Sequence, residues 1–238
     1  EQEDMQHKNM HAILTVARGS IEPPKFIEIH YNRQENVKPI ILIGKGVTFD
    51  SGGLCLKPSR YMEDMKYDMC GAAVVLGILK TLALEVSNHY VVALIPCVEN
   101  LPGRNAMRPG DVITTMAGKT VEIMDTDAEG RLILCDALTY AESYDPAVVI
   151  DLATLTGAVE VCLGDEAAAV LSNSQPLSRQ LERSGDVSYD RVWPLPLWEE
   201  YEDLLKSPIA DFQNVEKGRS SGCIVGGIFL SYFSKKYK

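Results

Sequence analysis

Several patterns that mark common protein classes are missing from this 238-residue chain. None of its six cysteines forms a C-x-x-C pair, and some lie inside apolar runs, which indicates free buried thiols in a reducing compartment rather than a disulfide framework. No positive segment followed by an apolar one opens the chain, so no signal peptide is visible. The longest apolar stretches, 72–79 and 223–230, are far shorter than the roughly 18 residues of a membrane span. We therefore expect a soluble cytoplasmic protein with no membrane partner.

Positive charge and histidine are also scarce. The formal net charge is -10, which disfavours binding to a nucleic-acid backbone. The acidic surplus fits either carboxylates gathered to hold divalent cations or a solvated surface that keeps the protein soluble, and charge alone does not decide between them. The four histidines are scattered and no H-E-x-x-H motif is present, so a histidine-rich zinc site is excluded. A metal site in this chain would have to be built from carboxylates.

The hydrophobic pattern alternates between strands and helices. Strands are expected at residues 11–18, 25–31, 40–43, 90–98, 120–124 and 147–151, and helices at 63–86 and 132–144. Strands that alternate with helices predict one α/β domain, in which helices cover both faces of a largely parallel central sheet. A composition that is 46% hydrophobic provides enough apolar material for its core.

Charged residues follow the predicted strands at one edge of this sheet. In parallel sheets, ligands bind beyond the carboxyl ends of the strands. The residues expected at that edge are Lys45, Asp50, Glu99, Asp127, Glu129 and Asp151. Their convergence is the first indication of a site.

Two segments concentrate residues with possible chemistry. Residues 44–53 (GKGVTFDSGG) lack the G-x-x-x-x-G-K-[ST] order of a phosphate loop, which disfavours a nucleotide site and leaves a glycine-rich turn with surface charges as the alternative. Residues 125–131 (DTDAEGR) place three carboxylates and an arginine between a strand and a helix. Helix capping accounts for one or two of these acids, but not for all three and the arginine. Such clusters are typical of two-metal hydrolases, in which two ions clamp a water.

The chain resembles the leucyl aminopeptidase (M17) family from about residue 9 to its end. The resemblance rests on the segments GKGVTFDSGGLCLK (44–57), MKYDM (65–69), DTDAEGRL (125–132), LATLTGA (152–158) and ADFQN (210–214). It implies a zinc-peptidase-like α/β fold and a two-metal-dependent aminopeptidase that removes N-terminal residues, preferably Leu or other apolar ones, from peptides. It also implies a homohexamer. A non-catalytic scaffold of the same family and a Cys-Gly-type dipeptidase remain alternatives.

The resemblance implies a ligand set for the two ions, which would be Zn²⁺ and/or Mn²⁺, Mg²⁺ or Co²⁺. The implied ligands are Lys45, Asp50, Asp68, Asp127 and Glu129, with Asp50 and Glu129 bridging the ions. Lysine binds a metal only when neutral, so two adjacent cations would have to hold the pKa of Lys45 well below its usual value of ~10.4.

The resemblance also implies catalytic and substrate-binding residues. Lys57 would hydrogen-bond the oxygen of the scissile carbonyl, and Arg131 would hold a bicarbonate that acts as general base. The pocket for the N-terminal side chain of the substrate would be lined by Met65, Thr154, Leu155, Thr156 and Gly157.

The chain departs from the family pattern at two positions and in its extent. Asp125 stands where the family has Asn, and Cys70 stands where it has Gly. The Asp125 side chain could point towards the ions or cap the following turn. Residues 1–238 are expected to form a catalytic metallopeptidase domain without the smaller N-terminal domain and the C-terminal end of family members. We therefore expect apolar sheet edges to be exposed.

Overall fold

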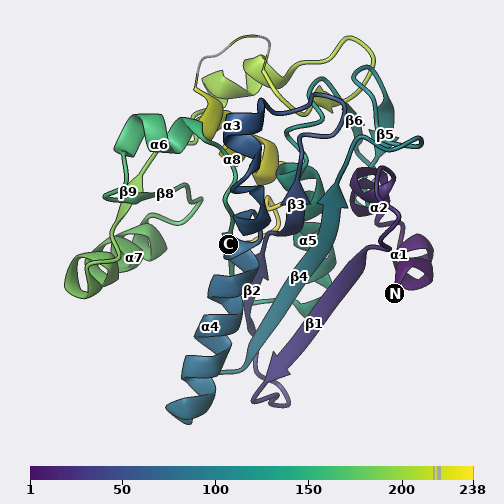
Figure 1. Ribbon diagram of the computed structural model, residues 1–238. Helices are drawn as coiled ribbons and strands as arrows, with labels where there is room; N and C mark the ends of the chain where they lie inside the picture. Colours follow the sequence, from purple (N-terminus) through teal and green to yellow (C-terminus); the bar gives the residue numbers. More distant parts are fainter. Residues whose placement is uncertain (217, 219–220, 238) are drawn as a thin grey trace.

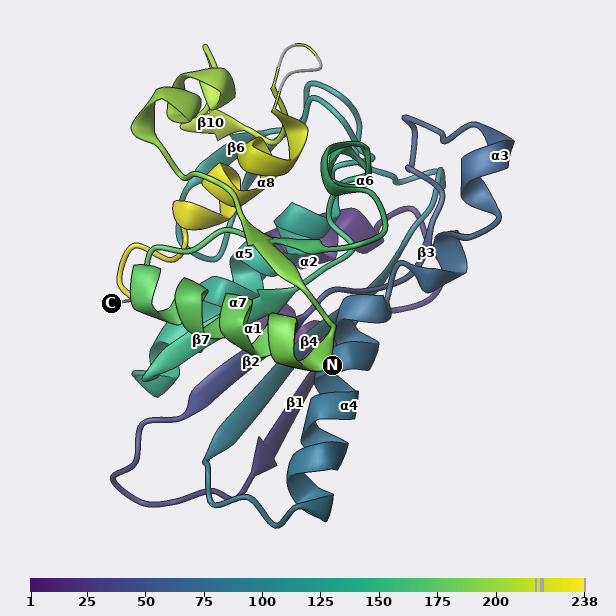
Figure 2. The ribbon, with the colours of Figure 1, turned by 90° about the vertical axis from the view of Figure 1, so that its left-hand side faces the viewer.

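The computed structural model describes residues 1–216, 218 and 221–237, and a five-stranded sheet forms its centre (Figure 1). Four strands lie side by side in the order β1 (Lys25–Tyr31), β4 (Val91–Asn100), β2 (Ile40–Gly44) and β7 (Val148–Leu152), as Figure 2 shows. The fifth strand, β3 (Gly46–Asp50), also pairs with β4. Within this sheet β1 runs antiparallel to its neighbour and the other pairs are parallel. The prediction of a largely parallel sheet is confirmed.

Strands β2 and β3 behave as one strand that is interrupted at Lys45. Both pair in parallel with β4, β2 with residues 91–94 and β3 with residues 97–100. At the interruption, the Lys45 N–H donates to the Leu152 carbonyl at 2.9 Å, and the Lys45 carbonyl accepts from the Ala72 N–H at 3.0 Å. These bonds hold the backbone of Lys45 at the carboxyl edge of the sheet, between β7 and helix α4 (Cys70–Leu84).

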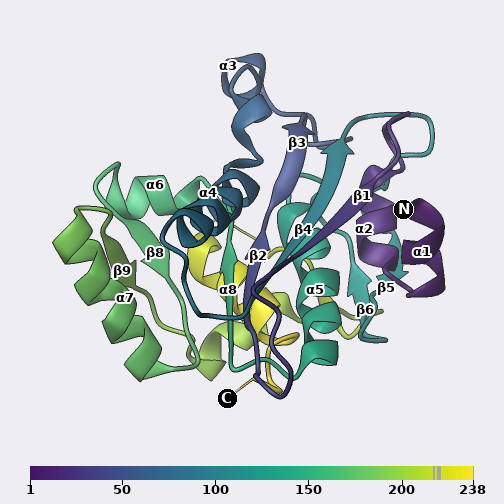
Figure 3. The same cartoon turned by 90° about the horizontal axis from the view of Figure 1, so that it is seen from below.

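Helices cover both faces of the sheet (Figure 3). Alternate residues of a strand point to opposite faces, and successive residues of β2 accordingly belong to two different cores. Leu42 packs in the core that contains Leu79 of α4. Ile43 packs in the larger core, to which α2 (His11–Ala17) and α5 (Gly130–Ala141) contribute. The predicted α/β fold class is therefore confirmed.

The other elements surround this centre. Strand β6 pairs with β5 and β10 in a second sheet, and β8 pairs in parallel with β9 in a third, with α7 between them in the sequence. In Figure 1, α7, β8 and β9 lie together at one side of the molecule. The bounds of these elements are α1 Gln2–His7, α3 Ser59–Met62, η1 Met65–Tyr67, β5 Val112–Thr114, β6 Thr120–Glu122, η2 Glu142–Tyr144, α6 Ala158–Leu163, β8 Ala168–Val170, α7 Gln175–Ser188, β9 Val192–Pro194, η3 Glu199–Leu205, β10 Phe212–Gln213 and α8 Gly222–Ser231.

The helical stretch Ser59–Leu84 has the length and composition of a membrane span, with a mean hydropathy of 1.5 over 18 residues. It is divided, however, into α3, η1 and α4, and α4 itself has 15 residues, fewer than the roughly 20 that a span requires. Buried residues of α4, among them Ala72 and Val75, pack in one core with residues of β2 and β4. We therefore interpret α4 as a helix that covers the sheet.

One predicted element is wrong in type, two others differ from the prediction in extent or in pairing, and one prediction about cysteines is wrong in part. Residues 11–18 form helix α2 rather than a strand, because their apolar side chains pack against α5. The helix predicted at 63–86 begins at Cys70, since the preceding backbone turns to bring Asp68 to Lys45. The strand predicted at 120–124 is present as β6 (Thr120–Glu122), but it pairs in the second sheet rather than in the central one. All six cysteines are free, as predicted, but only Cys135 is buried. Cys162 is exposed, and the other four are partly buried.

A buried carboxylate far along the chain holds the start of α2. The side chain of Asp136, in α5, is fully buried and accepts hydrogen bonds from the N–H groups of Ala12 at 2.9 Å and Ile13 at 3.1 Å. Its other oxygen accepts from the Met116 N–H at 2.8 Å. Because the first N–H groups of a helix lack partners within the helix, Asp136 acts as a remote cap of α2. It joins three segments that are distant in the sequence.

We expect Asp136→Asn to lower the free energy of unfolding by about 2–4 kcal/mol, since the amide group cannot accept at both oxygen positions and leaves a buried N–H unpaired. Urea unfolding followed by circular dichroism measures this change. The control is Asp145→Asn, which alters a carboxylate whose side chain is 81% exposed and should change stability by less than about 0.5 kcal/mol. Equal stability of the two variants would contradict the capping role.

Candidate metal centre

The side chain of Lys45 lies among carboxylates at the interruption between β2 and β3. Its Nζ donates to Asp68 Oδ1 at 2.8 Å and to the Thr154 carbonyl at 2.9 Å, and it lies 2.9 Å from Glu129 Oε1. Asp68 follows η1 directly, and its Oδ1 also accepts from the Thr154 hydroxyl at 2.7 Å. The side chains of Lys45, Asp68 and Glu129 are 1–5% exposed. Residue 130 must be small, because a Cβ there would lie 2.6 Å from the Lys45 Cε.

Lys57 makes a second pair of contacts in the same cluster. Its Nζ lies 2.9 Å from Asp50 Oδ2 and 2.5 Å from Asp127 Oδ1. Asp50 ends β3, and its other oxygen accepts from the Gly52 N–H at 2.9 Å and from Asn100 Nδ2 at 2.8 Å. The cluster thus combines the carboxylates of both sequence motifs with two lysines.

Two residues that the sequence analysis did not select lock these motifs together. Asn100, at the end of β4, donates from Nδ2 to the Thr126 carbonyl as well as to Asp50. The Thr126 hydroxyl donates to the Gly52 carbonyl at 2.6 Å and accepts from the Cys55 N–H at 2.8 Å. The sequence could have indicated Asn100 as a site residue, because it follows Glu99 at the carboxyl end of a predicted parallel strand. The partners of Thr126 depend on loop conformation, which no pattern in the sequence records.

The loop that carries Asp125 and Asp127 is fixed from the far end of the chain. The Asn214 Oδ1 accepts from the N–H groups of Met124 at 2.8 Å and Asp125 at 3.3 Å, and its Nδ2 donates to the Asp125 carbonyl at 2.6 Å. The Asp125 Oδ1 accepts from the Asp127 N–H at 2.8 Å. The structure therefore shows Asp125 capping the following turn, one of the two roles considered above, and its effect on bound ions stays a prediction.

The cluster can hold metal ions. Oxygen atoms of Asp50, Asp127 and Glu129 lie within 4.8 Å of one another. Among the described residues, the buried oxygens Asp68 Oδ2, Asp127 Oδ1 and Glu129 Oε1 have no partner with hydrogen-bond geometry, and each forms an ion pair with Lys45 or Lys57 at 2.5–2.9 Å. Carboxylate oxygens are ligands of both zinc and magnesium. Lys45 Nζ and these oxygens form a donor set of the kind that the resemblance implies.

Burial and mutual repulsion shift the pKa values of these carboxyl groups. The pKa of Glu129 is raised to about 7, because burial and repulsion by Asp50 and Asp68 outweigh the opposing effect of Lys45. The pKa of Asp127 is raised to about 6, because burial and repulsion by Asp50 and Asp125 outweigh the opposing effect of Lys57. Positive charge brought among these groups would relieve the repulsion and favour their ionised forms.

The two lysines respond to the same carboxylates. Burial by itself would lower the pKa of Lys45, but Glu129 and Asp68 outweigh this effect and raise the pKa above its usual value. The pKa of Lys57 is also raised, because Asp50 and Asp127 outweigh the effect of burial. In the conformation described, both ammonium groups therefore compensate the charge of the cluster.

Arg131 lies beside the cluster in the first turn of α5. Its side chain is buried, Nη1 donates to the Asn214 carbonyl at 2.7 Å, and Nε has no hydrogen-bond partner among the described residues. Burial lowers the pKa of Arg131, an effect that Glu216, Glu129 and Asp125 oppose. A buried guanidinium with an unused donor is suited to a small anion such as bicarbonate.

The predicted substrate-binding residues occupy two segments near the cluster. Thr154 contacts both Lys45 and Asp68, as described above, and the partly buried Leu155 packs against the large core. Gly157 precedes α6. The carbonyl of Met65 accepts from the Asp68 N–H at 3.3 Å, so Met65 lies in the same turn as a cluster residue. The pocket roles of Met65 and of residues 154–157 stay predictions.

Two residues that the sequence predicted at the site, Glu99 and Asp151, make none of the contacts described above with the carboxylates and lysines of the cluster. Glu99 lies within β4, where its carboxylate accepts a hydrogen bond from the Ser20 hydroxyl at 2.5 Å. Asp151 lies within β7 and is exposed. The Glu99 carboxylate binds Ser20 and the Asp151 side chain is exposed, so among the described contacts neither side chain joins the carboxylates.

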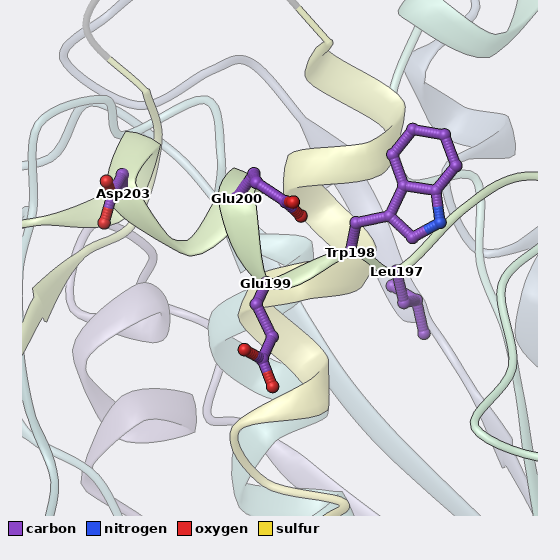
Figure 4. A pocket seen from close by; sticks show the side chains of 5 residues that line it. All are labelled: Leu197, Trp198, Glu199, Glu200 and Asp203. Atoms are coloured by element: carbon purple, nitrogen blue, oxygen red, sulfur yellow. The ribbon is translucent and has the colours of Figure 1, made fainter.

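An open depression of about 580 Å³ lies elsewhere on the surface (Figure 4). Its lining residues are Leu197, Trp198, Glu199, Glu200 and Asp203. None of them belongs to the cluster of Lys45 and its partners.

The fold and the cluster together define an α/β protein whose sheet carries, at its carboxyl edge, a buried carboxylate and lysine centre able to hold metal ions.

Comparison with known proteins assigns the family. The profile described as "Cytosol aminopeptidase family, catalytic domain" matches residues 1–238. The chain is 54% identical to the "Probable cytosol aminopeptidase" of Azoarcus sp. (strain BH72), covering 100% of this chain and 48% of that protein. For the protein of the same description from Thioalkalivibrio sulfidiphilus the identity is 52%, with the same coverage. A crystal structure of cytosol aminopeptidase from Coxiella burnetii matches with a TM-score of 0.92 and 40% identity, over 98% of this chain and 50% of that one.

The chain belongs to the cytosol aminopeptidase family, whose catalytic domain it matches along its whole length. The resemblance found in the sequence motifs is thereby confirmed. The chain spans about half the length of the curated relatives it matches.

We expect Asp125→Asn to retain the fold, because an amide oxygen can also accept from the Asp127 N–H, and to weaken divalent-ion binding modestly, by about twofold to fivefold, because a nearby negative charge is lost. Asp125→Ala should in addition lose about 1 kcal/mol of stability. Calorimetric titration with Mn²⁺ and thermal melting measure the two effects. Parent-like ion affinity in Asp125→Asn would leave capping as the role of Asp125.

Proposed function

We propose that this chain forms the catalytic domain of a metal-dependent aminopeptidase that removes N-terminal residues, preferably Leu or other apolar ones, from peptides. The observation that carries the proposal is the cluster of Asp50, Asp127 and Glu129, whose oxygen atoms lie within 4.8 Å of one another, in a chain of the cytosol aminopeptidase family. The names of the relatives support the aminopeptidase activity.

The proposed metal ligands are Lys45, Asp50, Asp68, Asp127 and Glu129. When bound, two divalent ions (Zn²⁺ and/or Mn²⁺, Mg²⁺ or Co²⁺) would activate a water molecule and polarise the scissile carbonyl. Asn100 and Asp125 hold two of the ligands, Asp50 through its carboxylate and Asp127 through its backbone N–H. Four of the ligands, Lys45, Asp50, Asp68 and Glu129, are buried, which excludes water and strengthens the charge interactions among them.

Two further residues would act on the substrate. The ammonium group of Lys57 would donate to the carbonyl oxygen of the scissile bond and stabilise the negative charge that develops there. Arg131 would hold a bicarbonate that accepts a proton from the attacking water; its unused Nε–H supports this role. Met65 and residues 154–157 would contact the N-terminal side chain of the substrate.

The proposal extends to the setting of the enzyme. We propose a cytoplasmic protein that assembles as a homohexamer and takes peptides as its substrates. The names of the relatives support the first part, and the resemblance to the family carries the assembly. A net charge of -10 disfavours nucleic acid as a further partner.

We expect removal of divalent ions to abolish hydrolysis of an N-terminal Leu from a chromogenic substrate, and readdition of Mn²⁺ or Zn²⁺ to restore it. The measurement compares chelator-treated and refilled protein on a panel that includes Leu, Lys and Glu derivatives and the dipeptide Cys-Gly. Turnover by protein shown to be free of metal would contradict the proposal. Cleavage of Cys-Gly alone would favour the dipeptidase, and no turnover with bound ions would favour the scaffold.

We expect Lys57→Ala to lower kcat by about 10²–10³-fold while ions still bind, as for the loss of one donor to an oxyanion. Arg131→Ala should lose less, because water or another anion can replace the bicarbonate. Lys66→Ala, which changes a lysine on the neighbouring turn that lies over the Tyr67 ring, is the control. Loss of bound metal in Lys57→Ala, with unchanged activity per ion that remains, would contradict the division of roles.

A further inference from the structure

The two lysines of the centre differ in how tightly they are enclosed. Lys45 is 4% exposed and is held by Asp68, Glu129 and a backbone carbonyl. The side chain of Lys57 is 15% exposed and extends from residues 54–58, several of which lie at the surface. Lys57 is therefore the less tightly enclosed of the two lysines.

The backbone at Lys57 is fixed close to the cluster. Its N–H donates to the Ser51 carbonyl at 2.9 Å, and the loop between these residues is bound to Thr126 through Gly52 and Cys55. A change in the position of the ammonium group must therefore come from rotation of the side chain. The loop holds the backbone of Lys57 near the carboxylates.

The ammonium group of Lys57 and a metal ion compete for the same space. Nζ lies 2.9 Å from Asp50 Oδ2 and 2.5 Å from Asp127 Oδ1, between two oxygens that belong to the proposed ligand set. A zinc ion binds carboxylate oxygen at about 2.0–2.2 Å, so an ion shared by these oxygens would overlap the position of Nζ. Like charges at such a separation also repel strongly in a partly buried site.

We propose that Lys57 is an internal competitor of the metal, a built-in cation that occupies the Asp50 and Asp127 oxygens until an ion displaces it. This inference rests on the proposed function. Displacement leaves the ammonium group beside the cluster, where it can face a substrate carbonyl. Binding of the ion and release of the Lys57 ammonium group towards the substrate then occur in one step. Lys57 thereby lowers the affinity of Asp50 and Asp127 for the ion.

The test compares ion binding by the parent protein, Lys57→Met and the control Lys66→Met. Methionine has nearly the length of lysine but carries no charge. Metal-stripped protein is titrated with Mn²⁺ or Zn²⁺ alone, in competition with a chromophoric chelator, and melting temperatures are recorded with and without the ion. We expect Lys57→Met to bind the weaker of two ions at least about tenfold more tightly, because no ammonium group has to leave. Lys66→Met should bind as the parent does.

The melting data provide an independent measurement. Without ions, Lys57→Met should melt below the parent, because two carboxylates lose their cation, and the rise in melting temperature on adding Mn²⁺ should exceed that of the parent. Unchanged or weaker ion binding in Lys57→Met, in a parent protein that binds ions and hydrolyses peptides, would overturn this inference alone. A parent protein that binds no divalent ion would overturn the proposed function together with it.

Discussion

Placing four carboxylates in one largely buried cluster is the constraint on which the rest of the site depends. Ions removed from water lose several kcal/mol of solvation each, so such a cluster persists only with compensating charge and hydrogen bonds. In this chain Lys45 and Lys57 supply the charge, and Asn100, Thr154 and backbone N–H groups supply hydrogen bonds. The same carboxylates then attract any divalent cation that can displace a lysine.

The sheet meets this constraint through close packing at its carboxyl edge. The strand formed by β2 and β3 is interrupted at Lys45, and the start of α4 comes so near that a Cβ at Gly44 would lie 2.6 Å from the Ala72 Cα. A Cβ at Gly71 would lie 2.1 Å from the Leu152 carbonyl oxygen. Glycine at these two positions brings α4 and β7 together around the lysine, and rigid elements thereby hold the cluster.

The sequence predicted the parallel sheet, its two helical layers and the motifs that carry the cluster. It did not predict α2, because residues 11–18 carry apolar, partly β-branched side chains that suit a strand or a buried helix equally. Asp136, 120 or more residues away, decides this by capping the helix. Glu99 and Asp151 were misplaced because strands β4 and β7 continue one or two residues further than the apolar runs suggest.

The sequence by itself determined the family and the residue types of the centre, because both depend on short motifs that can be recognised without knowledge of the fold. Only the tertiary structure decided which residues hold those motifs. Asn100, Thr126 and Asn214 hold the motifs through hydrogen bonds between segments up to 90 residues apart. Lys57 gains its two carboxylate partners because the same folding brings such distant segments together. Contacts of this kind follow from the packing of the whole chain, and local patterns do not encode them.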